Sequence, residues 1–396
     1  MYKIVELKNG LENVKNFYCG ATNVGMRPDK AQGDVAFIRS NVPCDISAVF
    51  TSNTFQAAPI KHFQKYPKDF KTNFVLINAK NANAMTGKKG VEDIDFIMSI
   101  LSKKQDVLNP LMSSTGVIGY RLPLEKVTSA FDTLDFHSKN SDDAARAIMT
   151  TDSFKKELAY KVELEDGTSF NIAAICKGAG MINPAMATML CFVITDADIP
   201  KLDMEALLLG STEHSFNRIS VDGDTSTNDT VMLLANKTSG NYDKKAFTQA
   251  LNKIMFELAM MILRDGEGAN KLVSFEVKGA KTVEDAQKAS MALSNSLLVK
   301  TALFGEDPNW GRIASTIGAS GIECNDETLT IHYDDLLIYS DEFRELDKVR
   351  ENKAYIIMKQ DAFKVTCDIG LGDASYISYG CDLSYEYVKI NAEYRT

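Results

Sequence analysis

The sequence lacks the features that mark several large classes of protein. Its seven cysteines are an odd number without a Cys-x-x-Cys pair, which argues against a disulfide framework and favours the cytoplasm. No apolar run approaches the roughly 20 residues of a membrane span, and the first ten residues lack the apolar core of a signal peptide. The formal charge of −9 argues against a nucleic-acid groove or an anionic membrane surface.

Common catalytic signatures are also missing. The four histidines never occur in a zinc-binding spacing, and there is neither a Gly-x-Ser-x-Gly elbow nor a Gly-Lys-Ser/Thr phosphate loop. Gly178 and Gly180 are followed by Asn183 where a dinucleotide fingerprint needs a third glycine. Zinc hydrolases, serine hydrolases of the elbow type and nucleotide-binding proteins are therefore disfavoured, and we expect neither a metal nor a cofactor.

Short apolar, β-branched runs alternate with segments of helical periodicity. The clearest helical pattern covers residues 243–263, with Asp243 as a plausible N-cap. We expect strands at 35–38, 74–77, 170–175, 189–194, 230–234, 272–277, 329–333 and 355–358, and helices at 91–101, 141–149, 202–216, 243–263 and 284–299. The mixture predicts an α/β protein, although hairpin-length links between strands do not favour a simple doubly wound sheet.

Residues 177–190 are the most suggestive segment. A loop of small residues leads to Ala187 and Thr188 and then into an apolar run typical of a buried strand. A hydroxyl held at the mouth of such a strand has the rigid support that a nucleophile needs. Cleavage of the Ala187–Thr188 bond would give Thr188 a free α-amine, with a reference pKa near 8, as the base for its own hydroxyl. The segment predicts a self-cleaving N-terminal-threonine enzyme, but the same threonine could be purely structural.

Two polar turns have both a functional and a structural interpretation. Residues 113–119 form a tight small-residue turn whose hydroxyls and N–H groups suit an oxyanion hole, or serve as an ordinary connection. Residues 222–229 start like a calcium loop, but Thr227 replaces the turn glycine and Leu233 replaces the bidentate glutamate. We therefore expect an Asx-rich turn near a polar site there.

Two later segments are equally ambiguous when taken alone. Residues 265–269 end the longest helical pattern with glycines that favour helix termination. Glu267 in this turn is either an exposed turn carboxylate or a receptor for a cation. Residues 307–312 hold the only tryptophan, Trp310, next to proline and arginine.

Together, in this order, the segments resemble the ornithine acetyltransferases, a family also called glutamate N-acetyltransferases, of arginine biosynthesis. The resemblance covers nearly the whole chain. The matching stretches are residues 81–87, 113–119, 147–152, 177–190, 222–229, 265–269, 307–313 and 391–396.

The resemblance implies an αββα sandwich that is similar to, but distinct from, the N-terminal-nucleophile hydrolases. It also implies that the precursor cuts itself between Ala187 and Thr188. The products would be an α chain, residues 1–187, and a β chain, residues 188–396, usually assembled as two of each. Thr188 would carry acetyl from N2-acetylornithine to glutamate. Some members of the family also take acetyl from acetyl-CoA, and no residue here decides whether this chain does.

The resemblance also assigns site residues. Thr115 and Gly116 match the oxyanion pair, and the substrate-contacting positions match Thr151, Lys177, Thr188, Glu267, Asn391 and Thr396. The chemistry of these side chains is consistent with the assignment. Both substrates carry an α-carboxylate, which Lys177 would pair with. Ornithine adds a δ-ammonium, which Glu267 would bind.

Two other interpretations remain open at this stage. The first is an aminopeptidase or amidohydrolase of a related self-cleaved fold, in which water accepts the acyl group. The second is an unprocessed relative that only binds amino acids or partners. An assay of transfer against hydrolysis separates the first from a transferase, and a denaturing gel showing one intact chain identifies the second.

Overall fold

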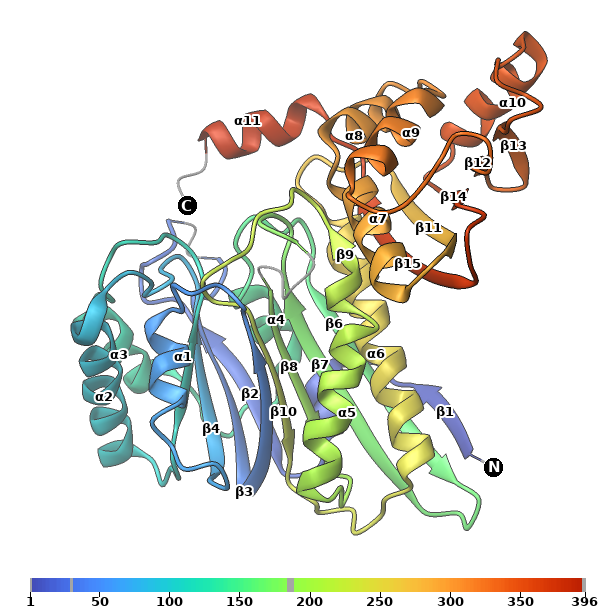
Figure 1. Cartoon of the computed structure of the whole chain (residues 1–396). Coiled ribbons are helices and arrows are strands. Elements are labelled where there is room, and N and C mark those ends of the chain that lie inside the picture. Colours follow the sequence, from blue (N-terminus) through green and yellow to red (C-terminus); the bar gives the residue numbers. More distant parts are fainter. Residues whose placement is uncertain (1, 29–30, 184–188, 394–396) are drawn as a thin grey trace.

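The computed structural model describes residues 2–28, 31–183 and 189–393, and it confirms the α/β class (Figure 1). Two sheets, of nine and six strands, are each covered by helices. All seven cysteines are free thiols, as the sequence predicts.

The nine-stranded sheet has the order β1-β6-β7-β8-β10-β3-β4-β5, and β2 pairs with β3. β8 and β10 are parallel neighbours at its centre. The bounds of its strands are β1 (Tyr2–Glu6), β2 (Phe17–Thr22), β3 (Val35–Phe50), β4 (Lys71–Asn78), β5 (Leu111–Ser114), β6 (Lys156–Leu164), β7 (Ser169–Lys177), β8 (Leu190–Thr195) and β10 (Thr230–Ala235).

Long strand β3 joins the two halves of this sheet. Its register with β4 shifts between Arg39 and Cys44. Side chains from one half, such as Val75, share a buried core with side chains from the other half, such as Ile175 and Phe192. The opposite face of the first half packs against α2 (Gly87–Lys104) and α3 (Leu124–Thr133).

The other half packs its outer face against α5 (Lys201–Glu213) and α6 (Lys244–Arg264). Figure 1 shows these two helix pairs on opposite sides with the strands between them. The order helix, strand, strand, helix agrees with the expected αββα arrangement. Two short helices, α1 (Ala58–Phe63) and α4 (Ser141–Ala147), complete this part of the molecule, together with the turns η1 (Gly10–Asn13) and η2 (Phe216–Arg218).

The smaller sheet has the order β13-β12-β14-β11-β15-β9. Its core combines side chains of these strands with side chains of α7, α8, α9 and α10. The bounds are β9 (Ile219–Ser220), β11 (Leu272–Ala280), β12 (Thr330–Tyr333), β13 (Leu336–Tyr339), β14 (Ala362–Asp368), β15 (Ala374–Cys381), α7 (Val283–Asn295), α8 (Leu297–Phe304), α9 (Trp310–Ala319), α10 (Lys348–Met358) and α11 (Tyr385–Glu393). The last helix, α11, extends away from this sheet over the larger part of the molecule (Figure 1).

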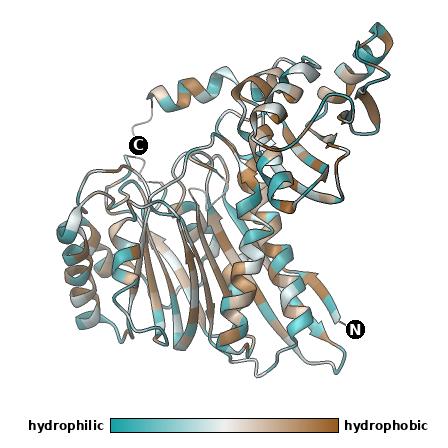
Figure 2. Ribbon diagram, viewed as in Figure 1, coloured by the Kyte–Doolittle hydropathy of each residue, from teal (hydrophilic) through white to brown (hydrophobic). Residues whose placement is uncertain are grey.

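Helix α6 is the longest helix in the described chain, and it begins where the sequence predicts. The Asp243 side chain accepts a hydrogen bond from Ala246 N at 2.8 Å, as an N-cap does. By length and composition alone α6 could cross a membrane, but 61% of its most apolar window is buried inside this protein. Figure 2 shows the apolar colour concentrated on the central strands and the inward faces of the helices, and the polar colour on the outward faces of α2 and α3.

Two sequence-based assignments were wrong. Residues 355–358, predicted as a strand, are the end of helix α10. Asp347 caps that helix by accepting from the backbone N–H groups of Val349 and Arg350, and its buried Ala354 and Met358 have helical spacing. The helix predicted at 284–299 is two helices, because Ser296 ends α7 and caps α8.

Candidate active site

Several chain segments that carry predicted site residues meet at one edge of the larger sheet. Lys177, at the end of β7, lies opposite Leu190, which begins the antiparallel strand β8. Thr230 begins β10 beside the same Leu190. A pocket opens at this edge, and residues from β7, from the loops after β5, α4 and α6, and from α11 line it. Ala187, Thr188 and Thr396 lie outside the described residues.

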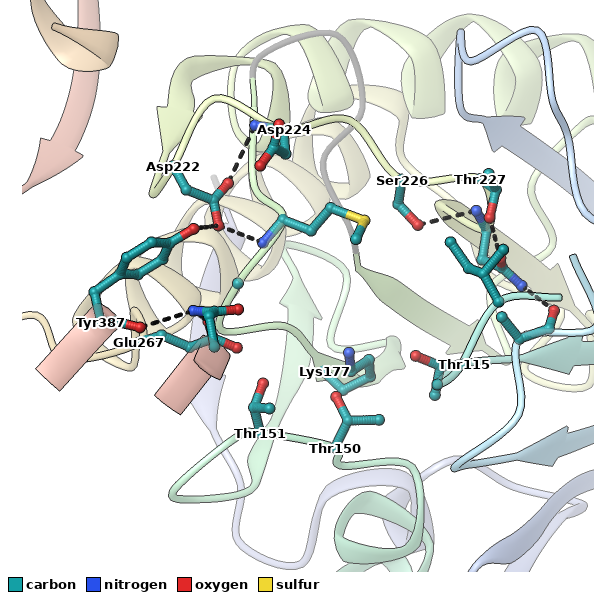
Figure 3. A pocket seen from close by; sticks show the side chains of 17 residues that line it. Thr115, Thr150, Thr151, Lys177, Asp222, Asp224, Ser226, Thr227, Glu267 and Tyr387 are labelled. Carbon is teal, nitrogen blue, oxygen red and sulfur yellow. Dashed lines mark hydrogen bonds between the residues drawn. The ribbon is translucent and has the colours of Figure 1, made fainter. Parts of the chain in front are cut away.

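The six described site residues of the sequence prediction all line this one pocket. They are Thr115, Gly116, Thr151, Lys177, Glu267 and Asn391. Figure 3 shows Lys177 between Thr115 on one side and Thr151 and Glu267 on the other. Segments separated by as many as 276 residues along the chain (115 to 391) therefore form one site.

The turn that follows β5 carries Thr115 and Gly116, the two residues predicted to form an oxyanion pair. Thr115 N donates to Asn78 O at 3.0 Å, and Val117 N donates to Lys80 O at 3.3 Å. Among the described residues, the Gly116 N–H between them donates no hydrogen bond and stays available for a ligand. Gly116 has φ +131°, and a Cβ there would lie 2.2 Å from Lys80 C, so only glycine fits.

Lys177 supplies a cation to the pocket. Its side chain is only 3% exposed, and its ammonium has no hydrogen-bond or ion-pair partner within the part of the chain that is described. Asp152 lies nearby. Burial alone would raise the pKa of Asp152, but the ammonium groups of Lys177 and Lys156 outweigh it and hold the pKa at about 2. The Asp152 carboxylate also accepts from Gly178 N at 2.7 Å and so fixes the loop that follows Lys177.

A buried ion network connects three of the segments that build the pocket. Lys156 Nζ lies 2.8 Å from Asp152 Oδ1 and 2.5 Å from Asp265 Oδ2, and all three side chains are almost completely buried. Asp152 accepts from Thr150 N at 3.0 Å, next to Thr151. Asp265 belongs to the turn that carries Glu267. The network therefore holds the Thr151, Lys177 and Glu267 segments together.

Glu267 brings a carboxylate to the same pocket. Its N–H donates to Ala179 O at 2.9 Å, and its Oε2 accepts from Asn391 Nδ2 at 2.7 Å. No described cation pairs with it, although the residue is only 8% exposed. The carboxylate lies against Gly180, where a Cβ would be 2.4 Å from Glu267 Cδ. The turn is thus a buried anionic part of the pocket and not an exposed connection.

Sequence reasoning missed part of the pocket wall. The hydroxyl of Tyr387, from α11, donates to Asp222 Oδ2 at 3.2 Å, and Figure 3 shows this contact across the pocket from Lys177. Asp222 also accepts from the N–H groups of Met181 and Ile182 at 2.6 and 2.9 Å, which orders the loop after Lys177. Burial raises the pKa of Asp222 above its usual value. The expected Asx turn near a polar site is confirmed, but nothing local in the sequence pairs it with Tyr387.

Asn228 is a second residue that the sequence reasoning did not single out. Its Nδ2 donates to Ala82 O at 2.6 Å and to Ser114 O at 2.8 Å, which connects the segment before β10 to the turn that carries Thr115. The only signal was its place in the polar run 222–229.

Comparison with known proteins identifies the family of this chain. A model of the ArgJ family matches residues 18–396. The arginine biosynthesis bifunctional protein ArgJ of Wolinella succinogenes is 54% identical over 397 residues, which cover 100% of both chains. The glutamate N-acetyltransferase of Methanocaldococcus jannaschii is 42% identical over 380 residues. The match covers 91% of this chain and 94% of that protein.

Among solved structures, an arginine biosynthesis bifunctional protein of Bacillus halodurans is 39% identical to this chain. It matches 51% of this chain and 98% of its own, with a TM-score of 0.48. The family resemblance predicted from the sequence motifs is confirmed by the family match and by the identity over the full length. The chain belongs to the ArgJ family.

Proposed function

We propose that this chain is a self-processed transferase that moves acetyl from N2-acetylornithine to glutamate through an acetyl group on Thr188. Its family membership makes it a glutamate N-acetyltransferase, an acyltransferase of arginine biosynthesis. The proposal adds the substrate pair, the covalent intermediate and the residues that carry each step.

One observation supports the substrate class above the others. A buried ammonium, Lys177, and a buried carboxylate, Glu267, line the same pocket, and neither forms an ion pair among the described residues, although Asp152 lies near Lys177. Burying unpaired charges is costly, so such groups are kept for a ligand of complementary charge. N2-acetylornithine has an α-carboxylate for Lys177 and a δ-ammonium for Glu267. Its α-nitrogen is acylated and carries no charge.

The transfer needs two acyl exchanges at one nucleophile. The Thr188 oxygen adds to the acetyl carbonyl carbon, and the negative charge that develops on the carbonyl oxygen is stabilised by the Thr115 hydroxyl and the Gly116 N–H. The Thr188 amine takes the proton of the Thr188 hydroxyl as the oxygen attacks. The bond between the acetyl carbon and the ornithine α-nitrogen then breaks, and the amine gives this proton to the leaving nitrogen. Glutamate binds next, and its α-amine attacks the acetyl-Thr188 ester in the reverse sequence.

Thr188 gains its free amine by self-cleavage. Its hydroxyl attacks the Ala187 carbonyl, the acyl group shifts from nitrogen to oxygen, and water hydrolyses the ester. The products are the α chain, residues 1–187, and the β chain, residues 188–396. We further propose that two of each assemble in the cytoplasm, and that acetyl-CoA serves as a second donor, in keeping with the word bifunctional in the name of the Wolinella succinogenes relative.

The hydrolase alternative is not favoured, because the curated relatives are named for arginine biosynthesis and glutamate N-acetylation. Steady-state kinetics test the proposal. Initial rates measured against both substrates should give parallel double-reciprocal lines, the pattern of a ping-pong enzyme. Intersecting lines would contradict a covalent intermediate. Release of acetate at a rate that does not depend on the glutamate concentration would indicate a hydrolase. A parallel assay with acetyl-CoA and glutamate tests the second donor.

A further inference from the structure

Asp229 is a buried carboxyl whose purpose the transfer reaction does not explain. It immediately precedes β10 and is 0% exposed. Its Oδ1 accepts from Met189 N at 2.9 Å, while the next residue, Thr230, donates its N–H to Met189 O at 3.1 Å. The amide that directly follows Thr188 in the chain is thus held by Asp229, and this amide nitrogen is bonded to the Thr188 carbonyl carbon.

The second carboxyl oxygen, Oδ2, is buried and has no hydrogen-bond partner within the described residues. The hydroxyl of the neighbouring Thr51 donates to Ser226 O at 2.7 Å. Burial raises the pKa of Asp229 well above its usual value, and the Met189 N–H, the Lys177 ammonium and the Thr51 side chain offset only part of this effect. When the carboxyl is protonated, its proton is on Oδ2, because Oδ1 accepts from an N–H.

We propose that Asp229 transfers protons during cleavage of the Ala187–Thr188 bond. This inference rests on the self-cleavage in the proposed function. As the Thr188 oxygen bonds to the Ala187 carbonyl carbon it loses a proton, and as the carbon–nitrogen bond breaks the Thr188 nitrogen must gain one. Asp229 gives its proton to the nitrogen and recovers one from the hydroxyl, so the carboxyl ends the shift unchanged.

A neutral Asp229 also suits the later chemistry. If the Asp229 carboxyl were ionised and close to the new α-amine, it would stabilise the ammonium form and raise the pKa of the amine, which would prevent the amine from acting as a base. A carboxyl that stays protonated leaves the amine free to take the proton of the Thr188 hydroxyl.

The decisive variant is Asp229→Asn. Its amide oxygen still accepts from Met189 N and its size is nearly unchanged, but it cannot transfer a proton. The labelled precursor is made by cell-free translation, and the appearance of two fragments is followed over time. General acid–base catalysis contributes about 10²- to 10⁴-fold, so we expect cleavage to slow at least 100-fold.

Asp196→Asn is the matched control. Asp196 follows the opposite end of β8, is 2% exposed and accepts from Asn171 N at 2.7 Å, and burial raises its pKa as well. It should leave the cleavage rate unchanged. Folding is checked in the Thr188→Ala background, in which the chain stays uncut. The melting temperature of Thr188→Ala is compared with that of the Thr188→Ala, Asp229→Asn double variant.

The pH dependence of wild-type cleavage gives a second readout that does not depend on a variant folding. A proton donor acts only while protonated, so the rate should fall once the pH rises above the pKa of Asp229. Lys177 is the charged side chain that acts on this carboxyl. Cleavage of Asp229→Asn at the wild-type rate, or a wild-type rate that does not fall at high pH, would overturn the inference. A wild-type chain that yields no break between residues 187 and 188 would instead overturn the proposed function.

Discussion

Glu267 and Asn391 are in direct contact across the pocket: Asn391 Nδ2 donates to Glu267 Oε2 at 2.7 Å, although 124 residues separate them in the chain. The contact orients the carboxylate without neutralising it, because an amide carries no charge. Glu267 therefore keeps its negative charge for a ligand while its position is fixed by α11.

Glu267→Gln tests the charge at this position. Glutamine keeps an oxygen for Asn391 but cannot pair with an ammonium. A hydrogen bond to a charged group contributes about 1.5–3 kcal/mol, so kcat/KM for N2-acetylornithine should fall roughly 10- to 150-fold. The value for glutamate, which has no distal ammonium, should fall less. Equal losses for both substrates would return Glu267 to the role of a structural turn residue.

Gly180→Ala tests the position of the same carboxylate without changing its charge. The new Cβ would lie 2.4 Å from Glu267 Cδ, the far end of a flexible side chain that can move. We expect a folded, processed enzyme with a displaced Glu267 and a weakened use of N2-acetylornithine. Gly210→Ala in α5, where nothing lies within 4 Å of the Cβ, is the control and should be fully active. A Gly180→Ala enzyme with unchanged kinetics would mean that the place of this carboxylate is unimportant.

Thr115→Ala removes one donor of the proposed oxyanion pair and leaves the Gly116 N–H. Loss of one such donor costs about 10²–10³ in rate. Self-cleavage and acetyl transfer should both slow, because both pass through a tetrahedral oxyanion at Thr188. Fragment appearance and turnover of the processed enzyme are the two measurements, and Thr115→Ser should retain most of each. Near-normal rates in the alanine variant would show that the turn only connects its neighbours.

Lys156→Met tests the buried ion network. It leaves Asp152 and Asp265 facing each other without a cation, and breaking a buried pair costs about 3–5 kcal/mol, measured as free energy of unfolding in denaturant. Lys161→Met, in the same strand, breaks the half-exposed pair with Glu163 and should cost less than about 1 kcal/mol. If both variants lost a similar free energy of unfolding, the buried network would contribute no more to stability than an exposed ion pair does.

The same network makes stability depend on acid pH. The pKa of Asp152 is lowered in the folded chain from its ordinary value of 3.8 to about 2. The contribution of Asp152 to the free energy of unfolding is therefore complete above about pH 4 and is lost as the pH falls toward 2. An Asp152→Asn chain should lose this part of the acid dependence, which urea unfolding at several pH values would show.

The sequence predicted the fold class and which described residues share one pocket, but it predicted the bounds of single elements less well. Thr115, Lys177 and Glu267 lie in short motifs with distinctive chemistry, so their order along the chain identified the family and placed them in one pocket. Periodicity located the long helix α6 with its cap, because an apolar stripe and a capping aspartate are both local signals.

Other features depend on contacts that no local pattern reports. Lys156 and Asp265 are 109 residues apart, and Tyr387 and Asp222 are 165 residues apart, so neither pair is visible in the sequence alone. Residues 355–358 resemble a strand because they are apolar, yet Ile356 is exposed. The helix that contains them is fixed by its N-cap at Asp347, eight residues before residue 355.

We propose above all that the acetyl group passes through Thr188 after the chain cuts itself. The most direct test is mass spectrometry of the denatured wild-type enzyme after incubation with N2-acetylornithine and no glutamate. The account predicts two fragments, with one acetyl group on the fragment that begins at Thr188, and loss of that group when glutamate is added. A single uncut chain, or an acetyl group found only on residues 1–187, would contradict it.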